Sequence, residues 1–164
     1  MSADEVHRND AAGHRFLPVA IDIRERRCVV VGGGPIGARK ALTLARSGAR
    51  VTIVSPALTE SLEASEGAGT LAWVRAAFGP EHVEGAFLVV AATDDEAVNA
   101  AVVEAAERAG ALVCDASSAD RSQVIFGATL RHGGATIAVF TDGHDPARAR
   151  RTRDHIKTLV ERAT

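Results

Sequence analysis

The sequence predicts an α/β fold built on a doubly wound parallel sheet, and three observations support this prediction. Short apolar runs recur along the chain, such as residues 28–31 and 86–92, and each could form a strand that is buried on both faces. Segments with apolar residues at helical spacing alternate with these runs. The links between them are short. Such alternation is typical of parallel sheets covered by helices, which bind ligands at the carboxyl ends of their strands.

The expected elements follow in chain order. We expect strands at 28–31, 50–54, 71–75, 86–92 and 111–114. The first helix should follow the first strand and end at Gly48. The next should cover 57–64, with Ser55 as cap and Pro56 at the first helical position. A third helix is expected at 96–108, after the capping residue types of 93–95.

A glycine-rich stretch follows the first strand. Gly32, Gly34 and Gly37 have the G-x-G-x-x-G spacing of a dinucleotide-binding turn. The first glycine allows the tight turn, the second lets the backbone approach a pyrophosphate, and the third lets helix and strand pack closely. Unpaired N–H groups at the helix start favour phosphate. Because a strand precedes the motif and a helix and second strand follow it, we interpret it as a dinucleotide site in a Rossmann-like sheet.

Composition excludes several classes of protein. The 164 residues carry 19 basic and 21 acidic side chains, so overall charge does not indicate nucleic acid or a membrane surface. No apolar run approaches the roughly 20 residues needed to span a bilayer. Cys28 and Cys114 both fall in expected strands, which favours two reduced core residues. The six histidines lack metal-site spacing, so we expect no metal centre. Taken together, these features of composition lead us to expect a cytoplasmic location.

The pattern changes after about residue 120. Residues 122–130 and 135–141 flank a Gly-Gly turn and predict an antiparallel β-hairpin. A basic helix is expected at 146–162, with Ile156, Leu159 and Val160 as apolar anchors. A hairpin alone is marginal in water, so this part is typical of an assembly element.

With these features in place, the chain resembles the precorrin-2 dehydrogenase/sirohydrochlorin ferrochelatase family, the amino-terminal half of sirohaem synthase. The resemblance covers Phe16 to about Leu159. Its carriers are residues 17–18, 28–40, 48–52, 91–95 with 98–99, 125–126 and 145–150.

The resemblance implies an oxidoreductase of tetrapyrrole (porphyrin-type) biosynthesis. The family oxidises precorrin-2 to sirohydrochlorin with NAD as hydride acceptor, and some members insert ferrous iron. It also implies a homodimer whose hairpins and last helices cross between subunits. The near-neutral charge separately argues against a nucleic acid or membrane partner. The cofactor-binding residues carried over by the resemblance are Gly32, Gly34, Pro35, Ile36, Gly37, Ser55, Pro56 and Thr93.

We therefore divide the chain into a flexible tail (1–14), an NAD-binding Rossmann-like domain (15–120) and a hairpin-plus-helix dimerisation element (121–164).

Strand two ends in Ser55 rather than in the acid that usually holds the ribose. The expected preference for NAD over NADP therefore rests on the family resemblance.

The catalytic position departs from the family. Where relatives carry an Asp in the loop after strand five, ungapped matching places Ser117, and Asp115 lies two residues earlier. A serine is a poor general base without a partner that takes its proton. Our catalytic candidates are therefore Asp115 and Ser117, and the departure argues against ferrochelatase activity.

Two hypotheses remain open: an NAD-dependent precorrin-2 dehydrogenase, or a catalytically silent NAD- or tetrapyrrole-binding module of the same fold. Basic side chains could receive the carboxylates of a tetrapyrrole, or could simply be solvated. They are Arg39, Lys40, Arg131, His132, Arg148, Arg150, Arg151 and Arg153.

Overall fold

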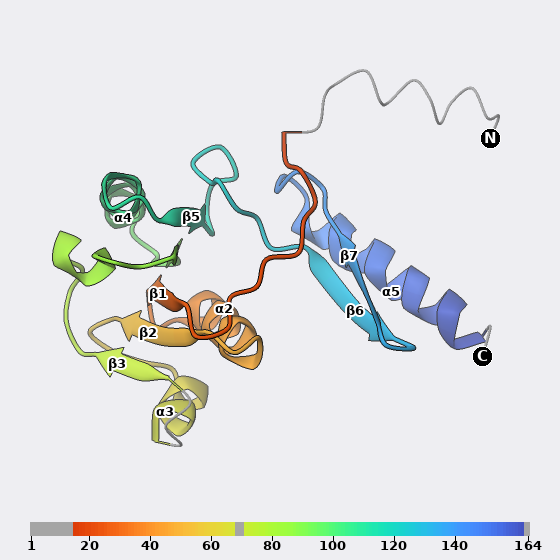
Figure 1. Cartoon of the computed structure of the whole chain (residues 1–164), viewed down its shortest axis with the longest axis horizontal. Coiled ribbons are helices and arrows are strands. Elements are labelled where there is room, and N and C mark those ends of the chain that lie inside the picture. Colours follow the sequence, from red (N-terminus) through yellow and green to blue (C-terminus); the bar gives the residue numbers. More distant parts are fainter. Residues whose placement is uncertain (1–14, 68–70, 163–164) are drawn as a thin grey trace. The chain divides into compact units, whose positions relative to one another are not determined.

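The computed structural model describes residues 15–67 and 71–162, and in these ranges the chain forms two compact units (Figure 1). Ile21–Ile125 form one unit, and the described residues before and after it form the other. The tail predicted at 1–14 lies outside the described residues. No helix of the described chain is both long enough and apolar enough to cross a membrane.

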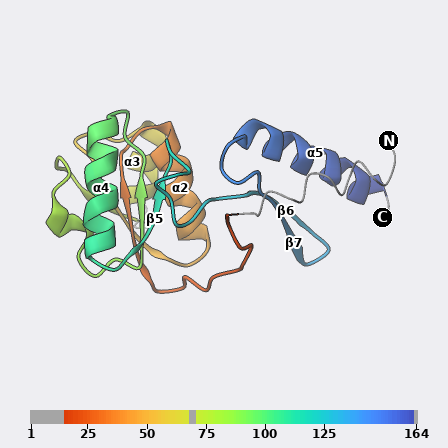
Figure 2. The same cartoon turned by 90° about the horizontal axis from the view of Figure 1, so that it is seen from above.

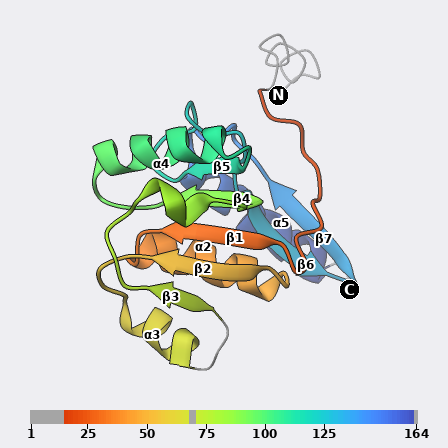
Figure 3. The same cartoon turned by 60° about the vertical axis from the view of Figure 1, so that its left-hand side comes forward.

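The first unit contains a parallel sheet of five strands. The strands are β1 (Arg27–Val31), β2 (Arg50–Val54), β3 (Ala72–Val74), β4 (Leu88–Ala91) and β5 (Leu112–Asp115). Figure 3 shows them side by side in the order β3-β2-β1-β4-β5. The strand order therefore reverses between β1 and β4. In such sheets the ligand crevice lies at this reversal, outside the carboxyl ends of the strands.

Helices connect these strands, as expected. They are α2 (Pro35–Arg46), α3 (Glu60–Gly67), α4 (Glu96–Arg108) and a short 3₁₀ helix, η1 (Pro80–Val83), which was not predicted from the sequence. Figure 2 shows the sheet between α2 on one side and α4 on the other. The predicted doubly wound α/β fold is confirmed.

The core follows from the alternation of side chains along the strands. Val29, Val31 and Val89 are almost fully buried in one cluster with the apolar face of α4. The intervening residues point to the other face, where Val30 approaches α2 at Gly37. Cys28 and Cys114 are buried and free, as predicted. Strands covered on both faces require the continuous apolar runs seen in the sequence.

Several predicted boundaries differ from the structure, and the two starts that differ most do so for identifiable reasons. The second helix begins at Glu60 rather than 57. The reason is that the Ser55 hydroxyl accepts from the N–H of Gly33, and its carbonyl accepts from Trp73, so Ser55 does not cap a helix. The first hairpin strand begins at Ala128 rather than 122, because Ser122 is buried and its hydroxyl hydrogen-bonds the loop after β5.

The second unit is a hairpin and a helix. Strands β6 (Ala128–His132) and β7 (Ala135–Val139) pair antiparallel through a turn at Gly133 and Gly134, both with positive φ, as predicted. Helix α5 (Pro146–Arg162) has the expected bounds. Leu159, however, is not an anchor, because it is 52% exposed.

Candidate functional site

The glycine-rich turn between β1 and α2 is built on close approaches. Gly32 has φ +117°, and a Cβ there would overlap the carbonyl of Ala92 at the end of β4. A Cβ on Gly37 would overlap the carbonyl of Gly32. These two glycines therefore have the turn and packing roles that their spacing predicts. They bring the ends of β1 and β4 together at the reversal of strand order.

A third glycine, Gly33, was not among the predicted site residues. Its N–H donates to Oγ of Ser55 at 3.1 Å, and a Cβ at this position would overlap the carbonyl of Ala57. The carbonyl of Ser55 accepts a 2.9 Å hydrogen bond from Nε1 of Trp73. Ser55 is buried, so its side chain holds the turn against the end of β2. A contact from Ser55 or the exposed Pro56 to the ribose stays a prediction.

Gly34 differs from the other glycines of the turn. It precedes α2 in an extended conformation, and a Cβ built on it meets nothing within 4 Å. Pro35 occupies the start of α2, and Ile36 is 44% exposed beside it. Within the described residues no side chain caps α2, and its first turn contains no acid. The positive end of this helix is therefore left for an anion from outside the chain.

Helix α4 shows the opposite arrangement. Its cap is Asp95, whose Oδ1 accepts from the N–H groups of Ala97 and Val98 at 2.8 and 3.2 Å. A carboxylate from the chain itself thus neutralises the start of α4. Of the two helices that begin beside the reversal of strand order, only α2 offers an N-terminus that no described side chain caps.

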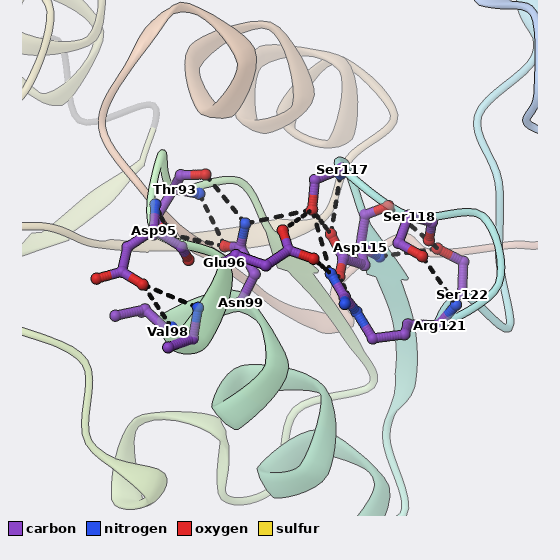
Figure 4. Close-up of polar contacts among 11 residues, drawn as sticks. Thr93, Asp95, Glu96, Val98, Asn99, Asp115, Ser117, Ser118, Arg121 and Ser122 are labelled. Carbon is purple, nitrogen blue, oxygen red and sulfur yellow. Dashed lines mark hydrogen bonds and ion pairs between the residues drawn. The ribbon is translucent and has the colours of Figure 1, made fainter.

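Thr93, at the end of β4, is held by Asn99 of α4 (Figure 4). Its N–H and hydroxyl both donate to Oδ1 of Asn99, at 3.0 and 2.7 Å. Its carbonyl accepts from Nδ2 of Asn99 at 3.0 Å. All of the polar groups of Thr93 therefore take part in contacts within the chain. Thr93 shapes the surface at the strand end, and its predicted contact with a cofactor stays a prediction.

The two catalytic candidates lie together after β5. Both the N–H and the hydroxyl of Ser117 donate to Oδ1 of Asp115, at 2.9 and 2.6 Å. Arg121 donates to Oδ2 of Asp115 at 2.7 Å and to Glu96 of α4 at 2.5 Å (Figure 4). Ser117 is also 3.2 Å from the second oxygen of Glu96. The loop after β5 is thus fastened to the first turn of α4.

This environment determines the charge of Asp115, whose side chain is fully enclosed. Burial alone raises the pKa of Asp115. The hydrogen bonds from Ser117 and Arg121 together outweigh burial and hold this pKa below its ordinary value of 3.8. A buried carboxylate with a low pKa, both of whose oxygens accept hydrogen bonds, is a weak proton acceptor at neutral pH. The geometry therefore favours a positioning role for Asp115, while Ser117 and Glu96 are the exposed members of the group.

The two neighbouring basic residues of α2, Arg39 and Lys40, have different environments. Arg39 and Arg46 line a cleft of about 430 Å³ between α2 and the start of α3, together with Thr59 and Ser61. Lys40 is half-buried instead, and burial lowers its pKa. Arg39 is therefore placed to meet an anionic ligand in a way that Lys40 is not.

The structure brings most candidate residues to one edge of the sheet. Gly32 approaches the end of β4, Asn99 joins Thr93 to Ser117, and Ser55 holds the turn from the β2 side. Asn99 and Arg121 were not among the residues predicted for the site. A signal for Asn99 was available, since it is a polar residue at a buried position of an otherwise apolar helical stripe.

This fold and site define a dinucleotide-binding α/β domain, and comparisons with known proteins agree. A family profile described as "Putative NAD(P)-binding" matches residues 19–128. A solved structure titled "SirC, precorrin-2 dehydrogenase" superposes with a TM-score of 0.78 at 30% identity, covering 88% of this chain and 71% of that one. The chain belongs to the precorrin-2 dehydrogenase family of NAD(P)-binding proteins.

Curated relatives agree in sequence. "Siroheme synthase 1" of Pectobacterium atrosepticum is 39% identical over 145 residues, which are 88% of this chain and 30% of the relative. "Siroheme synthase" of Nitrosospira multiformis is 38% identical over 152 residues, 90% of this chain and 32% of the relative. The chain therefore spans about a third of the length of these curated relatives.

Proposed function

We propose that this chain is an NAD-dependent dehydrogenase that oxidises precorrin-2 to sirohydrochlorin in sirohaem biosynthesis. The observation that carries this proposal is the start of α2, which no described side chain caps and which faces open space at Gly34 beside the reversal of strand order. The names of the solved and curated relatives support the choice of substrate. A location in the cytoplasm stays a prediction.

The residues of the turn fit a dinucleotide. Gly32, Gly33 and Gly37 fix the backbone by close contacts, whereas Gly34 leaves space in front of the helix. The N–H groups of the first turn of α2 would hold the diphosphate there. The exposed Ile36 would cover an apolar part of the coenzyme. When bound, NAD supplies the hydride acceptor.

The chain's own contribution is binding and orientation. Oxidation of precorrin-2 passes one hydride to NAD and releases one proton. Asp115, held as a carboxylate by Ser117 and Arg121, would fix the loop that faces the substrate. Ser117, which is exposed, would lie at the surface where the proton leaves, with Glu96 beside it. Arg39 and Arg46 line the cleft between α2 and the start of α3, so their guanidinium groups would favour an anionic group of the coenzyme beside the turn.

The direct test incubates the purified protein with precorrin-2 and NAD and follows the absorbance of NADH. We expect NADH and sirohydrochlorin to form in equal amounts. Tight NAD binding by calorimetry without NADH would favour the alternative, a catalytically silent NAD- or tetrapyrrole-binding module. A separate assay, in which ferrous iron is added to sirohydrochlorin, tests ferrochelatase activity. We expect no iron insertion, because the family's loop Asp is replaced by Ser117.

The hairpin and α5 would form a homodimer. Within the described part of this unit only Leu130 and Ala149 are buried, which is a small core for three elements. Leu159 is 52% exposed on the same helix. A second copy of the unit would cover this apolar surface.

We expect Leu159→Arg to shift the protein from dimer to monomer, since it removes apolar surface and adds charge at the contact. Sedimentation velocity measures the effect. Thr158→Arg adds the same charge at the neighbouring exposed position and is the matched control. A wild-type chain that sediments as a monomer at all accessible concentrations would contradict the dimer.

A further inference from the structure

Asn99 is an unusual residue for its position. It lies in the second turn of α4, and only 1% of its surface is exposed. The neighbouring buried positions of this helix are apolar, among them Val102, Val103 and Ala106. Burying a primary amide is costly unless its donors and acceptor are paired. An alanine or valine would suit the helix better, so the contacts of the amide must account for its presence.

These contacts run almost entirely to Thr93. The Oδ1 atom of Asn99 accepts from the N–H and the hydroxyl of Thr93, and Nδ2 donates to the carbonyl of the same residue. The orientation of the amide follows from this pattern, because an N–H must meet the oxygen and a carbonyl must meet the nitrogen. The amide thereby takes the place of a neighbouring strand for Thr93, just beyond the end of β4 (Figure 4).

The position of Thr93 matters because Gly32 lies against it. A Cβ built on Gly32 would come within 3.0 Å of the Thr93 nitrogen, and the N–H of Ala92 donates to the carbonyl of Val31 at 2.8 Å. On the other side, Nδ2 of Asn99 lies 3.4 Å from Oγ of Ser117. One side chain thus links the end of β4 to the loop after β5, at the place where β4 meets the glycine-rich turn.

We propose that Asn99 is a positioning residue for the coenzyme: it fixes the Ala92–Thr93 backbone and the Ser117 loop as a preformed floor for the nicotinamide half. This inference rests on the proposed function, because it assumes that NAD binds across the reversal between β1 and β4. Without the amide the strand end would sample several conformations, and binding would have to select one of them.

The test uses Asn99→Asp in the full chain. Aspartate has the same shape and keeps an acceptor for the Thr93 N–H, but its carboxylate cannot donate to the carbonyl of Thr93 or to Ser117. We expect NAD affinity, measured by calorimetry, to fall by about tenfold or more at neutral pH, since a lost donor leaves two oxygens facing each other. Hydrogen exchange at the Thr93 amide should accelerate in the coenzyme-free protein.

The pH dependence of the variant separates positioning from general destabilisation. Protonation of the introduced carboxylate restores one donor, so the NAD affinity of Asn99→Asp should recover toward acid pH, whereas that of the wild type should not. Val102→Ala is the matched control, because Val102 is fully buried on the same helix and has an apolar side chain. It should lower Tm while changing NAD affinity by less than about twofold.

A second variant covers the case in which Asn99→Asp does not fold. Thr93→Val keeps the shape of Thr93 and removes only its hydroxyl, so a smaller loss of NAD affinity is expected. If Asn99→Asp or Thr93→Val binds NAD as tightly as Val102→Ala does, the inference is overturned while the proposed function stands. If the wild type itself does not bind NAD, both are overturned.

Discussion

Gly34→Val should leave the fold intact and reduce the affinity for NAD by about a hundredfold or more, equivalent to roughly 3 kcal/mol. The backbone of Gly34 is extended, and a Cβ there meets nothing within 4 Å, so the chain itself tolerates a side chain. The added methyl groups would occupy the space in front of α2 where the diphosphate must approach. Calorimetric titration with NAD and the thermal unfolding curve measure the two parts of the expectation.

The control for this substitution lies three residues further on. A Cβ on Gly37 would overlap the carbonyl of Gly32, so Gly37→Ala should destabilise the whole first unit rather than act on the coenzyme alone. An unchanged NAD affinity in a folded Gly34→Val protein would contradict both the coenzyme site and the function built on it.

Asp115→Ala should lower the free energy of unfolding by about 3 kcal/mol, measured by urea denaturation. The substitution removes an enclosed acceptor and leaves the N–H of Ser117 and the guanidinium of Arg121 without this partner. Glu104→Ala on α4 is the matched control, because Glu104 is exposed and forms an ion pair with Arg108 on the helix surface. That pair should contribute about 0.5 kcal/mol or less. If the two variants lost the same free energy of unfolding, the hydrogen bonds around Asp115 would not contribute the stability expected of them.

The same carboxylate predicts a direction for acid stability. The pKa of Asp115 in the folded protein lies below its ordinary value of 3.8. Its stabilising contribution is therefore complete above the unfolded-state pKa and is lost as the pH falls through the lower, folded-state pKa. Asp115→Asn should consequently show a flatter loss of stability than the wild type below about pH 4.

Much of the fold could be predicted because it depends on local patterns. The strands around Val29 and Val89 are continuous apolar runs, and α4 and α5 have the expected bounds because apolar spacing and end residues agree. The errors arose where tertiary contacts compete with local preference. Ser55 has the chemistry of a helix cap, but the N–H of Gly33, 22 residues away in sequence, uses its hydroxyl instead.

The candidate site was predictable to a similar degree. The spacing of the glycines indicated the turn, since the roles of Gly32 and Gly37 are intrinsic to a strand-turn-helix unit. The link from Asn99 to Thr93 and Ser117 depends on where a helix meets two strand ends, which spacing along the chain does not encode. Likewise, the partner that holds Asp115 is Arg121, on a loop for which the sequence shows no periodic pattern.

The hydrogen bond from Gly33 to Ser55 has a consequence for engineering coenzyme preference. In many proteins of this architecture, the residue that ends the second strand can be exchanged to favour one nicotinamide coenzyme over another. Here that residue is Ser55, which is buried and accepts a hydrogen bond from the glycine-rich turn. Exchanging it would therefore destabilise the turn as well as change the coenzyme preference. Redesign should begin instead at Ala57, whose side chain is exposed, and at Arg39 across the neighbouring cleft.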